Sequence, residues 1–284
     1  MKRFAFLVAV ISLLMFTSCT VTKQGRVKLR KVLTLTMPRT VPPGVGVEEP
    51  DMPGTRGASV VWDPIQKKYY AAMAGNALFP LGVYDAAGKK LSEDELNCEA
   101  DTRGLWYNTQ LKQVQGNAYN DGGWFGYKLD EKGIPEEAEI LLEGMNQPDE
   151  QSVGAYNPDK QEVLFLNRSD VSFYTYKSTL SGNSIRIIWG RTKTMGKSED
   201  MGDDPTPENY NYSTAIYTGI KGSELGFLNT TTHEIELYSI ADGFMTKKLA
   251  IPEDQPLYKS FNFAYTNGMY WLFNIDKREW TAYK

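Results

Sequence analysis

The chain has 284 residues, of which 41% are hydrophobic, 12% aromatic and 23% charged, and this composition excludes a disordered chain, a coiled coil and a collagen-like protein. A formal net charge of −4 leaves no basic surface to neutralise phosphates, so nucleic acid is not an expected partner. One His and two Cys offer little for metal chemistry, and we expect neither a metal nor a cofactor.

Residues 1–18 have the features of a secretory leader. Lys2 and Arg3 precede an apolar run over residues 4–16. This run is too short to cross a bilayer as a helix, because a spanning helix needs about 20 residues. We therefore expect the leader to be cleaved rather than to anchor the chain as a helix.

Cys19 follows a small Thr-Ser pair, and this arrangement resembles a bacterial lipobox, with Phe16 in place of the usual Leu. The resemblance implies that Cys19 becomes the acylated first residue, bearing palmitate or a similar chain, with residues 19–25 as a tether. No acidic cluster of the kind that resembles a surface-export signal in Bacteroidota lipoproteins follows Cys19, which favours the outer membrane facing the periplasm. The alternative is an ordinary signal peptide that contains a cysteine by chance. If Cys19 is acylated, Cys98 remains a free thiol and no internal disulfide forms.

An internal repeat dominates the rest of the sequence. Each repeat contains an aromatic residue that is followed by a turn. These aromatic residues are separated by 45, 49, 61 and 48 residues, and they are Trp62, Tyr107, Tyr156, Tyr217 and Tyr265. A short apolar strand follows each of them, and a third strand with alternate Tyr or Trp comes next. Polar turns that contain Gly or Asn separate the strands, and no window has a long helical period.

Each repeat predicts three or four antiparallel strands, which cannot bury both faces unless neighbouring repeats stack on them. We therefore predict an all-β fold, a five-bladed β-propeller formed by residues 26–284 as a single domain. The blades are expected to start near residues 58, 103, 152, 212 and 260. A two-sheet β-sandwich with coincidental repetition is the alternative.

The last repeat ends at Lys284 without an outer strand. Residues 27–37 alternate well enough for a half-buried strand, and we expect them to supply the missing one and to close the ring. Residues 39–56 are rich in Pro and Gly and connect this strand to the first repeat. In the style of its repeats the chain resembles small bacterial propeller lipoproteins of the Bacteroidota type, and the resemblance carries no functional motif.

Thr-Arg-Gly occurs twice just before a predicted inner strand, at Arg56 and Arg103, and Lys259 has a similar place in the last repeat. Cations that converge at one end of the channel would form an anion site, because a guanidinium matches the geometry of carboxylate, phosphate or sulfate. In the competing interpretation each Arg packs over an aromatic ring or pairs with Asp101 or Glu150.

A catalytic alternative rests on acidic residues before the second and third inner strands. Five-bladed glycosidases use three inward carboxylates at a channel mouth, and the candidates here are Glu99, Asp101 and Glu150. The other repeats have no equivalent. Trp189 lies off the repeat strands, beside an insert within residues 192–212, and is a candidate for sugar stacking.

These features predict an envelope-anchored, extracytoplasmic binding or assembly module rather than an enzyme. Its channel mouth would take an anionic or glycan ligand, and an envelope protein is a further candidate partner. The alternative is a glycan-active enzyme of the same architecture. Three carboxylates that converge at one mouth would favour the enzyme, whereas a single carboxylate would favour the binder.

Overall fold

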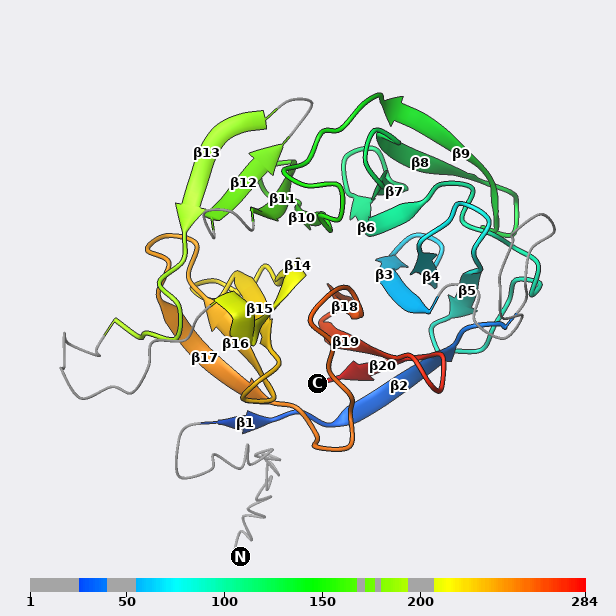
Figure 1. Ribbon diagram of the computed structural model, residues 1–284. Coiled ribbons are helices and arrows are strands. Elements are labelled where there is room, and N and C mark those ends of the chain that lie inside the picture. Colours follow the sequence, from blue (N-terminus) through cyan, green and yellow to red (C-terminus); the bar gives the residue numbers. More distant parts are fainter. Residues whose placement is uncertain (1–25, 40–54, 168–171, 177–179, 194–206) are drawn as a thin grey trace, which may run out of the picture.

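The computed structural model describes residues 26–39, 55–167, 172–176, 180–193 and 207–284. The described residues form five β-sheets and one 3-10 turn, η1 (Pro207–Asn209). Figure 1 shows the sheets arranged as a ring around a central axis. In this part of the chain no helix is long and apolar enough to cross a membrane. The predicted leader, Cys19 and residues 194–206 of the insert lie outside the described residues.

Each sheet runs outward from the axis in chain order (Figure 1). The inner strands are β3 (Arg56–Asp63), β6 (Thr102–Asn108), β10 (Ala155–Asn157), β14 (Tyr210–Tyr217) and β18 (Phe263–Thr266). The second strands are β4 (Lys68–Ala74), β7 (Gln113–Ala118), β11 (Glu162–Asn167), β15 (Leu225–Asn229) and β19 (Met269–Asn274). The third strands are β5 (Leu81–Asp85), β8 (Trp124–Leu129), β12 (Ser172–Tyr176), β16 (Glu234–Tyr238) and β20 (Glu279–Tyr283). Three sheets add an outer strand from the same repeat, which is β9 (Pro135–Leu142), β13 (Leu180–Arg186) or β17 (Met245–Ala250).

The second strands other than β7 are apolar along most of their length because a blade packs against neighbours on both faces. Aromatic side chains fill the space between blades. Trp271 and Tyr69 come from adjacent blades, and their ring centroids are 5.2 Å apart. Trp124 packs in the same way against Phe165 of the next blade, at 6.2 Å. The stacking of blades therefore makes the core, as the repeat predicts.

The closure of the ring by the N-terminal segment is confirmed. β2 (Lys31–Thr36) pairs antiparallel with β20 and gives the last sheet the order β18-β19-β20-β2. The structure also differs from the prediction, because residues 27–37 form two strands rather than one. The first of them, β1 (Val27–Lys28), pairs parallel with β17 and so joins the fourth sheet. The segment thus links two adjacent blades, and the protein is a five-bladed β-propeller closed by its N-terminal strand.

Two side chains from other parts of the ring hold this segment in place. The hydroxyl of Tyr84 donates a hydrogen bond to the carbonyl of Thr36 at 2.7 Å. The buried guanidinium of Arg278 donates from Nε and Nη2 to the carbonyl of Pro38, at 3.0 and 2.6 Å. These contacts bond the backbone on either side of Met37, which is itself buried.

Candidate functional site

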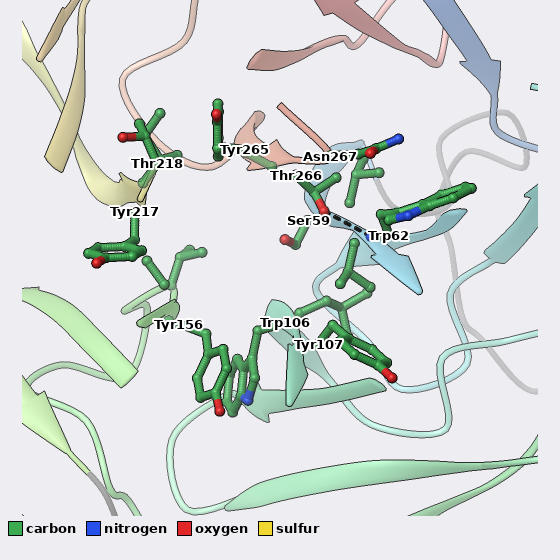
Figure 2. A pocket seen from close by; sticks show the side chains of 18 of the residues that line it. Ser59, Trp62, Trp106, Tyr107, Tyr156, Tyr217, Thr218, Tyr265, Thr266 and Asn267 are labelled. Atoms are coloured by element: carbon green, nitrogen blue, oxygen red, sulfur yellow. Dashed lines mark hydrogen bonds between the residues drawn. The ribbon is translucent and has the colours of Figure 1, made fainter. Parts of the chain in front are cut away.

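A cavity of about 320 Å³ lies in the central channel, near the ends of the five inner strands (Figure 2). Every inner strand contributes to its lining. The lining includes all five aromatic residues that mark the sequence repeat, namely Trp62, Tyr107, Tyr156, Tyr217 and Tyr265. The periodic signal in the sequence therefore marks the rim of a cavity as well as the blades.

Polar side chains fix the turns that follow these aromatic residues. The Oδ1 atom of Asp63 accepts hydrogen bonds from the backbone N–H groups of Ile65 and Gln66, at 2.7 and 3.0 Å. Asn108 makes the same turn in the second blade, where its Oδ1 accepts from Gln110 and Leu111. Such Asx turns end each strand sharply and hold the preceding side chain in a constant place.

Two hydrogen bonds cross from one blade to the next at this rim. The backbone N–H of Trp62 donates to Oγ1 of Thr266 at 2.9 Å, which ties the first blade to the fifth. The side-chain amide of Gln161 donates from Nε2 to Oγ1 of Thr109 at 3.3 Å, which ties the third blade to the second. Hydrogen bonds between blades therefore help to hold the rim.

Three aromatic residues, Trp106, Tyr156 and Tyr217, belong to one wall of the cavity. In Figure 2 the rings of Trp106 and Tyr156 lie side by side, and these rings, like those of Tyr217, Trp62 and Tyr107, point outward from the centre. Trp106 is buried, whereas Tyr156 and Tyr217 are half-buried and pack against the apolar clusters between blades.

Neighbouring side chains pack closely around Gly154 in this wall. A Cβ at this position would lie 2.8 Å from Cγ1 of Val163 and 3.0 Å from the ring of Trp106. A side chain at position 154 would therefore push the indole ring out of its place.

The cavity is uncharged. In the described part of the chain, its lining contains no Asp, Glu, Lys, Arg or His, and its polar groups are hydroxyls and one side-chain amide, including Ser59, Thr218 and Asn267. Burial raises the pKa of both Tyr217 and Tyr265, so these phenols remain neutral at physiological pH. Apolar surface with a few neutral polar groups is typical of a small-molecule binding pocket.

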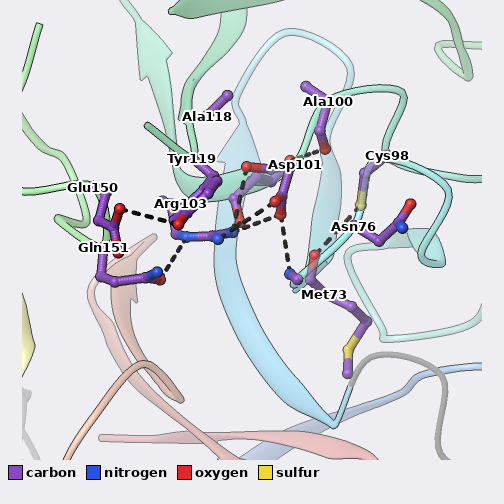
Figure 3. Close-up of polar contacts among 12 residues, drawn as sticks. Met73, Asn76, Cys98, Ala100, Asp101, Arg103, Ala118, Tyr119, Glu150 and Gln151 are labelled. Atoms are coloured by element: carbon purple, nitrogen blue, oxygen red, sulfur yellow. Dashed lines mark hydrogen bonds and ion pairs between the residues drawn. The ribbon is translucent and has the colours of Figure 1, made fainter. Parts of the chain in front are cut away.

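The other end of the channel has a different chemistry (Figure 3). Arg103 is 2% exposed, and its Nη1 lies 2.6 Å from Oδ1 of Asp101. Its Nε donates to Oε1 of Gln151 at 2.9 Å, and its guanidinium lies 4.6 Å from the ring centroid of Tyr119. A salt bridge, hydrogen bonds and a ring contact thus hold this side chain in one position.

Arg56 reaches the same place from the first blade. Its guanidinium carbon lies 4.9 Å from the ring centroid of Phe261, and that of Arg103 lies 5.6 Å from the same ring. The two arginines that the sequence singled out therefore meet at one aromatic side chain. Glu150 lies beside them and accepts a hydrogen bond from the hydroxyl of Tyr119 at 3.0 Å (Figure 3).

The remaining candidates lie apart from this cluster. Oε2 of Glu99 accepts from the backbone N–H of Ala138, on the outer strand β9, at 2.7 Å. Lys259 is exposed in the loop that leads to Phe261. Trp189 packs with a ring separation of 4.4 Å against Tyr210, within the fourth blade's apolar cluster.

Cys98 is free and buried, and its Sγ lies 3.5 Å from the carbonyl oxygen of Pro80. Burial raises the pKa of this thiol to about 12, so it is unreactive in the folded protein. Among the described residues, no group of three or more His, Cys, Asp or Glu is arranged to hold a metal ion.

The cavity was not foreseen from the sequence. The repeat did identify Tyr156, Tyr217 and Tyr265, but as landmarks of the blades rather than as lining. The sequence did not predict a role for Phe261, because a single Phe between Ser260 and Asn262 does not belong to the repeat pattern.

No protein-family model and no curated protein matches the sequence. Among solved structures, the chain is similar to a glutaminyl cyclase from Myxococcus xanthus, with a TM-score of 0.55 and 7% identity over 90% of this chain and 96% of that one. At this identity the likeness concerns the fold, and it agrees with the propeller architecture. Auxiliary nutrient binding proteins from Bacteroides thetaiotaomicron and Bacteroides ovatus match at 10% identity, with TM-scores of 0.41 and 0.39. The chain covers 58% of the length of each of these two proteins, and 80% of this chain is aligned.

Proposed function

We propose that this protein is an extracytoplasmic binding module, anchored to the bacterial envelope through Cys19, whose cavity binds an uncharged ligand such as a segment of a neutral glycan. The observation that supports this proposal is the uncharged cavity of about 320 Å³ whose lining includes half-buried aromatic residues. A sugar ring has apolar C–H faces and a hydroxyl edge. Aromatic rings match the faces, while the hydroxyl of Ser59 matches the edge.

The catalytic alternative requires carboxylates that point into one mouth of the channel. Within the described residues, the cavity has none in its lining. At the opposite end, Asp101 is paired with Arg103 and Glu150 is bonded to Tyr119, while Glu99 bonds the outer strand β9. This arrangement lacks a group poised as acid beside one poised as base, so the geometry favours binding over glycoside hydrolysis.

A panel of neutral oligosaccharides tests the proposal, with the affinity measured by calorimetry and by tryptophan fluorescence. Tyr217→Ala and Tyr156→Ala each remove a ring from the wall. We expect each to weaken binding about tenfold or more, because burying an aromatic ring contributes about 1.5 to 3 kcal/mol.

Tyr212→Ala is the matched control. Tyr212 lies on the same strand β14, is 38% exposed and does not line the cavity, so its removal should leave the affinity unchanged. If no oligosaccharide binds, or if the wall variants bind as well as the unaltered protein, the proposed function is wrong.

Anchoring has a separate test. We expect mass spectrometry of the mature protein to find an acylated Cys19 at its N-terminus, and Cys19→Ala to release the protein from the membrane fraction. An unmodified mature N-terminus at any other residue would exclude the lipid anchor and leave the binding proposal to its own test.

A further inference from the structure

The guanidinium of Arg56 has no hydrogen bond or ion pair within the described part of the chain. It lies over the ring of Phe261. The residue is half-buried at the end of the channel opposite the aromatic cavity. A contact with the ring supplies no oxygen acceptor, so the N–H donors of this guanidinium have no hydrogen-bond acceptor within the described part of the chain. A cation that is partly removed from water and has free donors favours a bound counter-ion.

Neighbouring charges do not supply that counter-ion. Oδ1 of Asp101 is already bonded to Nη1 of Arg103 and to the backbone N–H of Gly75, at 2.6 and 3.1 Å. Glu150 accepts a hydrogen bond from the neutral hydroxyl of Tyr119. Arg103 is therefore paired directly with a carboxylate, whereas no carboxylate of the described residues forms an ion pair with Arg56.

The aromatic surface under both arginines is held in a costly conformation. Phe261 and Asn262 have φ angles of 50° and 60°, in the left-handed region that residues other than Gly rarely adopt. A non-Gly residue held there costs about 1 to 3 kcal/mol, and such strain is concentrated at functional sites.

Bonds from two other blades maintain that conformation. The backbone N–H of Phe261 donates to Oγ of Ser213 at 2.6 Å, and the backbone N–H of Gly57 donates to Oδ1 of Asn262 at 2.7 Å. The surrounding fold thus places the ring of Phe261 where both guanidinium groups meet it.

We propose that this end of the channel is a second binding site, separate from the aromatic cavity, which binds an oxyanion group of a ligand through the free N–H donors of Arg56. Carboxylate, phosphate and sulfate share the required chemistry, two or more oxygens that accept in-plane hydrogen bonds. Arg103 is a positioning residue here, because its own donors are largely used and it acts by supporting Phe261 and the local positive field. Lys259 is exposed and adds a weaker, salt-screened attraction.

The test uses ¹⁵N-labelled protein and follows the side-chain Nε–H signal of Arg56 while sodium acetate, phosphate or sulfate is added at constant ionic strength. We expect this signal to shift and saturate with at least one of the three anions, which also identifies the preferred class. The signal of Arg30, exposed between β1 and β2 on the outer rim, should shift little and without saturation.

Variants give a second readout, the rise in melting temperature on adding the same anion instead of chloride. Arg56→Gln should bind about tenfold more weakly or worse, since a charge-assisted bond is lost, and it should melt as the unaltered protein does in chloride. Arg30→Gln, the matched control, should keep the full anion response. The proposal is overturned if Arg56 and Arg30 respond alike to all three anions, or if Arg56→Gln keeps the anion response. Neither result affects the oligosaccharide test of the aromatic cavity.

Discussion

The two ends of the channel are built from the same five inner strands, yet they differ in chemistry. Where these strands end, the lining is uncharged and aromatic, and short Asx turns hold it. Where they begin, Arg56 and Arg103 meet on Phe261. In the first three blades the strand ends lead into the same short Asx turn, whereas the strand starts follow the connections between blades, which differ in length and sequence.

This difference shows how a repeat protein separates architecture from specificity. Where the same Asx turn recurs, as in the first three blades, the same residue types recur around that mouth. A connection between blades has no such constraint, and two adjacent blades can place cations where the others place neutral residues. We therefore expect changes at the two ends to have different consequences.

Removing residues 26–37 should have the largest effect and should damage both ends. The deletion strips β2 from the last sheet and leaves β20 as an open edge. It also removes the buried side chains of Leu35 and Met37, which together should cost at least about 5 kcal/mol of unfolding free energy. Calorimetry and size-exclusion chromatography should show a much lower melting temperature and aggregation. A chain that begins at Gly25 is the control, and equal melting of the two proteins would contradict closure by this strand.

Phe261→Ala should be the most destabilising single substitution of the two mouths. Phe261 is 1% exposed, and its truncation should cost about 3 to 5 kcal/mol, as for other buried Phe residues, while the left-handed backbone stays strained because Ala also carries a Cβ. Tyr217→Ala, at the other mouth, should cost less than about 1 kcal/mol, because Tyr217 is half-buried at the rim. Denaturant unfolding measures both losses, and similar values would show that the two ends do not differ in rigidity.

Gly154→Ala should act on the aromatic mouth alone. The added Cβ would meet Val163 and the ring of Trp106 at 3.0 Å or less, so the blades must shift at a cost of about 1 to 3 kcal/mol. Near-ultraviolet circular dichroism should report the displaced indole, and oligosaccharide affinity should fall. The anion response at Arg56 should persist. A loss of that response as well would mean that the two ends are mechanically coupled.

The smallest expected effect is that of pH on ligand affinity at the aromatic mouth, where we expect no change. Burial raises the pKa values of Tyr217 and Tyr265 above 10, so the neutral phenols persist as the pH rises from 5 to about 9. Titration calorimetry with a neutral oligosaccharide should therefore give a constant affinity over this range. A sharp change near neutral pH would reveal a charged group at the mouth that the lining does not contain.

Much of the architecture followed from the sequence by itself. The spacing from Trp62 to Tyr265 indicated five blades, and the missing strand after Lys284 indicated closure by residues 27–37, which β2 confirms. The all-β fold class was likewise correct. These features are encoded locally, because alternation of side chains and turn residues act over a few neighbouring positions.

The chemistry of the two mouths was decided by the tertiary structure. Asn262 bonds Gly57, which is 205 residues away in the sequence, and this contact brings Phe261 under Arg56. The sequence left open whether Arg103 faces a ligand or pairs with Asp101, and the structure places it in a salt bridge with that residue. Likewise, the repeat marked Tyr156 and Tyr217 without indicating a cavity between them. Such contacts depend on how separate blades stack around the axis, and a local pattern holds no information about the partner that a distant blade supplies.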